Sequence, residues 1–136
     1  KKIIIARKKA LRDRVLLYTF TTENDLILAR DARVDAIDSQ ISLAKTLIKN
    51  DEIKLSNAKG RITSIVKNNR IAPQNLHQEV SSLGKQINNN YVYIGEKSTE
   101  RKKIFQTFTE DLARFRELKK KQMDARQRRN KADEFD

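Results

Sequence analysis

A seven-residue apolar repeat constrains the fold of this chain more than any other feature of its sequence. In the first half, a large apolar residue recurs at Phe20, Ile27, Val34, Ile41, Ile48, Leu55 and Ile62. A companion row, which three charges interrupt, follows three residues later at Glu23, Arg30, Ile37, Ala44, Asp51, Ala58 and Ile65. Such rows are the a and d positions of a left-handed coiled coil. The repeat therefore predicts a long helix that buries a narrow seam against another helix.

The second half carries a similar but less regular repeat. Its first row is Val80, Ile87, Ile94, Arg101, Phe108 and Phe115, and its second row is Leu83, Asn90, Lys97, Ile104, Asp111 and Leu118. Long charged side chains can reach solvent from a narrow two-helix seam. The polar interruptions are therefore compatible with a second seam helix, although they weaken its middle.

The only proline, Pro73, separates the two halves. Proline lacks an N–H and pushes the preceding residue toward extended geometry, so a single continuous helix is not expected. Antiparallel pairing of the two seams, with Ile62 opposite Leu83, is centred beside this proline. The predicted fold is an all-α, antiparallel two-helix coiled-coil hairpin in a single domain, residues 1–136. Its predicted parts are a first helix over about 3–68, a turn over 69–73 and a second helix over about 73–133.

The N-terminal segment fits this scheme least well. Residues 15–22 favour extended structure, and Thr22-Glu-Asn-Asp25 could cap a new helix, so a break there is an alternative to one continuous helix. The heptad phase runs on through Phe20, which favours the continuous helix. Ile3, Ile4, Ile5, Ala10 and Leu11 lie on a shifted phase, so the first turns are expected to leave the seam or to meet another protein.

Positive charge is concentrated in two segments. The chain has 30 Lys and Arg residues against 18 Asp and Glu, a net charge of +12. Residues 1–14 hold seven basic residues against one acidic, and residues 114–131 hold nine against two. In a hairpin these two segments would lie together at the open end. Such a concentrated positive field attracts an acidic partner.

The residues that most enzyme sites need are scarce. There is no cysteine, and His77 is the only histidine, which is too few for a metal site by itself. There is no glycine-rich phosphate loop and no run of 18 apolar residues. The sequence therefore predicts a protein that is not an enzyme, has no cofactor and does not insert into a membrane.

Several interpretations of the basic segments remain open. They could be the solvated faces of a structural coiled-coil spacer. They could also bind nucleic acid or ribosomes through phosphates, although poor interleaving with aromatic residues would make that binding nonspecific. The third interpretation is an acidic protein partner.

Two terminal motifs are similar to those of a known family. The sequences Arg126-Gln-Arg-Arg-Asn-Lys-Ala-Asp-Glu-Phe135 and Ile4-Ile5-Ala-Arg-Lys-Lys-Ala-Leu-Arg-Asp-Arg14 resemble the two ends of the central-stalk proteins of type III secretion and flagellar export, the YscO/FliJ family. The resemblance implies a cytoplasmic, monomeric helical hairpin at the secretion apparatus. It also implies that the paired terminal ends enter the ring of a hexameric export ATPase, while the remainder reaches toward the export-gate protein or secretion chaperones.

Transferred to this chain, the resemblance assigns two sets of residues. The set expected at the ATPase ring is Lys8, Lys9, Arg12, Arg14, Arg126, Arg128, Arg129 and Lys131. The set expected to contact the gate or a chaperone is Ile71, Leu76, His77, Tyr91 and Tyr93.

Overall fold

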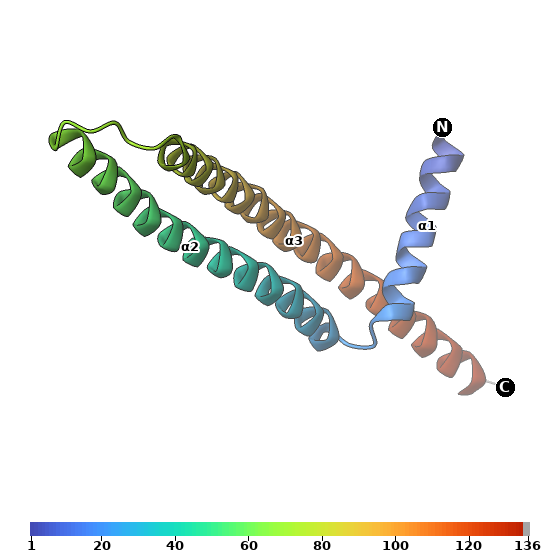
Figure 1. Cartoon of the computed structure of the whole chain (residues 1–136). Coiled ribbons are helices and arrows are strands. Elements are labelled where there is room, and N and C mark those ends of the chain that lie inside the picture. The colour runs from blue at the N-terminus through green and yellow to red at the C-terminus, as the bar shows by residue number, and fades with distance from the viewer. Residues whose placement is uncertain (135–136) are drawn as a thin grey trace. The chain divides into compact units, whose positions relative to one another are not determined.

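The computed structural model describes residues 1–134, and it confirms the all-α class. The described residues form three helices and no strand: α1 (Lys2–Thr19), α2 (Glu23–Lys67) and α3 (Gln74–Glu134) (Figure 1). Internal contacts divide the chain into two compact units. The junction unit comprises residues 1–34 and 103–136, and the turn unit comprises residues 35–102. Phe135 and Asp136 lie outside the described residues.

The predicted single helix over residues 3–68 is wrong, because the chain leaves helical geometry after Thr19. Phe20 is extended, with φ −120° and ψ 130°. The side chain of Thr22 accepts a hydrogen bond from the Asp25 N–H at 3.2 Å, and the Asp25 carboxylate accepts one from the Thr22 N–H at 3.1 Å. This reciprocal pair is a capping box, which satisfies N–H groups that a helix start leaves free. The local cap therefore prevails over the heptad phase, and Figure 1 shows α1 leaving the line of α2 at this point.

The connection between α2 and α3 begins with a left-handed residue. Asn69 has a φ of 58°, the Asn69 N–H donates to the Val66 carbonyl at 3.0 Å, and the Arg70 N–H donates to the Ile65 carbonyl at 3.1 Å. These two bonds form a Schellman motif, in which asparagine is a common substitute for glycine. Pro73 directly precedes α3. The predicted interruption around residues 69–73 is therefore present, and α2 ends before the proline is reached.

In the turn unit, α2 and α3 run antiparallel (Figure 1). Glu52 accepts a hydrogen bond from the Tyr91 hydroxyl at 3.3 Å, and Asp38 pairs with Arg101 at 2.8 Å. The buried seam residues of this unit are Ile37, Ala44, Ile48, Ala58 and Leu83. All five belong to the rows that the heptad pattern predicts, so the burial of these seam positions is confirmed. Ala72 and Leu76, which lie outside those rows, are buried as well.

The junction unit follows the seam prediction with one exchange. Val34, Ile104 and Phe115 are buried at predicted positions. Glu23, which the repeat places in the seam, is exposed, and Leu26 is buried instead. Because α2 starts anew at its cap, its first turn need not keep the phase of the preceding helix.

Candidate interaction surface

The core of the junction unit holds α1 against α2 and α3. Leu16 of α1, Leu26 of α2 and Phe115 of α3 form a buried cluster, in which Phe115 is only 1% exposed. The half-buried residues packed against this cluster are Leu17, Phe20, Phe108, Leu112 and Leu118. Leu16 and Leu26 were not predicted as core residues, because neither lies in the heptad rows. The burial of these side chains fixes the C-terminal half of α1.

A bidentate ion pair supports the same contact. Arg114 donates from Nε to one Asp13 carboxylate oxygen at 2.9 Å and from Nη2 to the other at 2.7 Å. Arg114 also pairs with Glu117 at 2.8 Å. The hydrogen bonds from Arg114 lower the pKa of Asp13 below its ordinary value, and they outweigh the opposing effect of burial. Asp13 is therefore an internal partner of α3, which no spacing in the sequence could reveal.

Two further ion pairs use acidic residues of the same unit. Arg12 pairs with Asp111 at 3.1 Å, and Arg116 pairs with Glu23 at 2.7 Å. The hydrogen bond from Arg116 lowers the pKa of the Glu23 carboxyl. The acidic side chains near the docked part of α1 are thus paired with arginines of the same unit. Within residues 1–134, they do not pair with the basic residues nearer the ends of the chain.

The two basic segments do not pack along each other, contrary to the expectation of a paired open end. Every described residue from 1 to 12 is exposed, and so are residues 120–134 of α3 except Ala125. The bend before Thr22 directs α1 across α3 rather than along it. Like-charge repulsion between the two segments also opposes close pairing.

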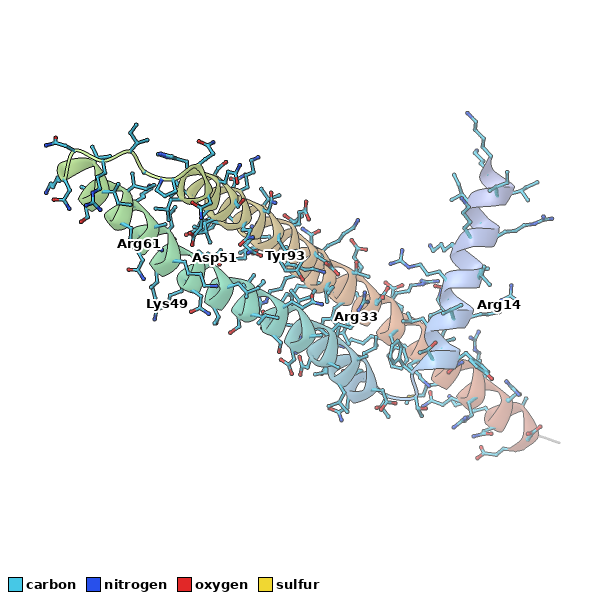
Figure 2. All side chains as sticks on the ribbon, in the orientation of Figure 1. Arg14, Arg33, Lys49, Asp51, Arg61 and Tyr93 are labelled. Carbon is cyan, nitrogen blue, oxygen red and sulfur yellow. The ribbon has the colours of Figure 1, made fainter. Side chains whose placement is uncertain are left out.

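The residues expected at an ATPase ring are exposed in both helices. Lys8, Lys9 and Arg14 project from α1, and Figure 2 labels Arg14 there. Arg12 is exposed too, but its ion pair with Asp111 occupies part of its charge.

The corresponding residues of α3 are Arg126, Arg128, Arg129 and Lys131, and all are exposed. Arg126 and Arg129 line one shallow depression on α3, whereas Arg128 donates to the Asp124 carbonyl at 3.4 Å. Among the described residues, none of the four takes part in the ion pairs of the junction unit. Their charge is available to a partner.

The residues expected at a gate or chaperone differ in their accessibility. Ile71 and His77 are exposed near the turn. Leu76 is buried in the turn unit, so a contact through its side chain would require the unit to rearrange. Tyr91 is exposed and bonds to Glu52, and Tyr93 is half-buried beneath the Lys97 ammonium, whose nitrogen lies 5.5 Å from the ring centroid. Their role as a contact surface stays a prediction.

Sequence reasoning recognised only part of an exposed apolar face of α1. Ile4, Leu11, Val15 and Tyr18 of α1 are all exposed, and Tyr18 is 95% exposed. The shifted phase of residues 3–11 was visible in the sequence, but its continuation through Val15 and Tyr18 was hidden by the assumption that this segment extended the main seam.

Comparison of this chain with known protein families, with characterised proteins and with solved structures finds no match. Within residues 1–134, no helix is long and apolar enough to cross a membrane. In the same residues, no group of three or more histidine or carboxylate side chains could hold a metal ion. The class of protein that the fold and charge define is a basic, all-α protein whose basic residues near the two ends are exposed.

Proposed function

We propose that this chain is a non-enzymatic stalk or coupling protein that binds an acidic protein partner through the basic segments of its junction unit. The single observation that carries the proposal is the separation of charge within this unit. Asp13, Glu23 and Asp111 are occupied by internal arginines, whereas the basic residues nearer the two ends are exposed. By sequence, the unit has nineteen Lys and Arg residues against eleven Asp and Glu.

The partner that we propose is the hexameric ATPase of a type III secretion or flagellar export system. The resemblance of the two terminal motifs supports this choice, and the exposed basic residues supply charge for the contact. In this proposal α2 and α3 pair as an antiparallel coiled-coil hairpin, and residues near the turn face the export gate or a chaperone. An asymmetric protein within a six-fold ring contacts its subunits unequally, so it can change nucleotide affinity from one subunit to the next.

The test is a titration of the protein into candidate export ATPases from the same genome, with hydrolysis rate and ring assembly as readouts. The test variant carries Arg126→Glu, Arg128→Glu and Arg129→Glu. The matched control carries three reversals at exposed positions of the turn unit, Lys49→Glu, Lys59→Glu and Arg61→Glu (Figure 2 labels Lys49 and Arg61). We expect wild type and control to stimulate hydrolysis and the test variant to fail. Equal loss in both variants would show that only net charge matters.

Nucleic-acid binding is the second candidate function, and the same exposed basic residues favour it. Lys and Arg side chains that neutralise phosphates release counterions, so such binding weakens by orders of magnitude between about 50 and 200 mM salt. The two triple variants would then lose affinity for DNA and RNA to a similar degree. That result, without stimulation of any ATPase, would replace the stalk proposal.

A further inference from the structure

The outer face of α1 has the spacing of a second coiled-coil seam. We define the outer seam as Ile4, Lys8, Leu11, Val15 and Tyr18, which follow one another at intervals of four, three, four and three residues. This alternation is that of successive d and a positions over two heptads. Ile4 is 59% exposed, Leu11 57% and Val15 56%, so more than half of each residue faces solvent.

The opposite face of α1 packs against the rest of the junction unit. Asp13 binds Arg114, and Leu16 is buried in the junction core. A helix turns about 100° per residue, so residues two apart point to nearly opposite sides. Val15 and Tyr18 therefore point away from the side of α1 that carries Asp13 and Leu16. Because the inner face alone docks α1, the apolar residues of the outer face are not needed for that contact.

The residues beside the outer seam define the chemistry of a suitable partner. In a coiled coil, the e and g positions flank the seam and select the partner by charge. Here those positions include Arg7, Arg12 and Arg14, and Lys8 lies within the seam itself. A second copy of this chain would place these cations beside the same cations of the other copy, and this like-charge contact is unfavourable. A helix with acidic flanking residues would instead complement them.

We propose that the outer seam of α1 docks an acidic amphipathic helix of a partner protein. The helix would cover Ile4, Leu11, Val15 and Tyr18, and its carboxylates would face Lys8 and the flanking arginines. This inference deepens the proposed function. It rests on one part of that proposal, namely that the chain acts by binding a protein. Two heptads bury a small area, so the contact is weak alone and suits a transient or multivalent assembly.

The test uses the full chain and a synthetic three-heptad peptide. The peptide carries Leu and Ile at its a and d positions, Glu at e and g, and one Glu placed to face Lys8. A scrambled peptide of the same composition is the first control. The variant Leu11→Glu with Val15→Glu places two charges in the outer seam. Its matched control, Leu43→Glu with Leu47→Glu, introduces the same two glutamates at the same spacing at exposed apolar positions of α2. Circular dichroism at 222 nm checks that both variants keep their helices.

We expect fluorescence anisotropy to show binding of the designed peptide and not of the scrambled one. The outer-seam variant should bind at least tenfold more weakly, since burial of one Leu or Val side chain already corresponds to about that factor. The control variant should remain within about twofold of wild type. Lowering the salt should strengthen binding of the designed peptide, because the flanking charges attract it.

Five results would overturn the proposal. No binding of the designed peptide would show that the face does not accept such a helix. Equal weakening in both double variants, or equal binding of the scrambled peptide, would reduce the effect to net charge. Binding of wild type to phosphatidylserine-containing vesicles that displaces the peptide would assign the face to anionic lipid. Self-association in the ultracentrifuge that the outer-seam variant abolishes would assign it to a second copy.

The peptide test and the ATPase test distinguish the two proposals, because either test can give a negative result while the other gives a positive one. The peptide experiment contains no ATPase, and the variant with Arg126, Arg128 and Arg129 reversed leaves the outer seam intact. Stimulation of an ATPase without peptide binding would refute this inference alone. Peptide binding without stimulation of any ATPase would leave the acidic-helix site in place and refute the stalk.

Discussion

Replacement of Phe115 with alanine is expected to destabilise the junction unit more than any other single truncation. Phe115 is the largest fully buried side chain among the described residues, and it lies where α1, α2 and α3 meet. A buried phenylalanine removes about 150–250 Å² from water. Truncation to alanine gives up most of this buried area, and each Å² of it contributes about 25 cal/mol to the free energy of folding. Measured costs for such changes are about 3–5 kcal/mol.

We expect a value near the lower end, about 3 kcal/mol, because a thin helical layer can partly collapse into the space. Urea unfolding followed by circular dichroism at 222 nm gives the change in the free energy of unfolding. Limited trypsin digestion gives a second readout, since cleavage after Arg14 should accelerate when α1 loses its docking site. If the two units unfold in separate transitions, only the transition of the junction unit should move.

Tyr18→Ala is the matched control, because it removes an aromatic ring from the same unit at a position that is 95% exposed. Its expected cost is within about 0.5 kcal/mol. A cost below about 1 kcal/mol for Phe115→Ala would refute the assignment of the junction core. An equal cost for both substitutions would show that the ring of Tyr18 is buried in solution.

Three further predictions concern the contacts that shape each unit. Arg114 lowers the pKa of Asp13, so this pair stabilises α1 docking above the ordinary pKa of aspartate, about 3.9, and the stabilisation is lost as the pH falls through the lower folded value. Asp13→Asn should abolish that part of the acid dependence of the free energy of unfolding, measured by urea unfolding at a series of pH values. Asn69→Gly should raise the urea midpoint and Asn69→Val should lower it, because a φ of 58° suits glycine and strains a β-branched residue. Gly84→Ala should raise the thermal midpoint and increase the free energy of unfolding by about 0.5–1 kcal/mol, since the added methyl group meets no atom within 4 Å. An unchanged or lower midpoint would contradict the helical environment found there.

The heptad rows predicted most of the buried positions, because burial along a helix depends mainly on its periodicity. Ala44, Ile48 and Ala58 are buried as their spacing requires. The interruption before Pro73 was also predictable, since proline disfavours helical geometry there, although α2 itself ends earlier, at Lys67, ahead of the left-handed Asn69. The same local rules named Thr22 and Asp25 as a cap, but they did not show whether the cap or the continuing heptad phase would prevail.

The candidate site was less accessible to sequence reasoning. The basic residues near both ends could be named from the charge pattern, and they are exposed. Their expected pairing failed because it assumed a straight first helix. The outer seam of α1 was recognised only through Ile4 and Leu11 for the same reason, since Val15 and Tyr18 gain their outward position only when Leu16 turns inward.

The sequence by itself determined the all-α class, the buried rows, the position of the turn and the excess of positive charge near the two ends. These properties follow from local periodicity, backbone restriction and composition. Only the tertiary structure decided that Leu26 would be buried in place of Glu23, that Asp13 would bind Arg114, and that α1 would cross α3. Each of these outcomes depends on contacts between residues far apart in the chain, whose balance no local pattern contains. The exposed apolar face of α1 is a product of that balance.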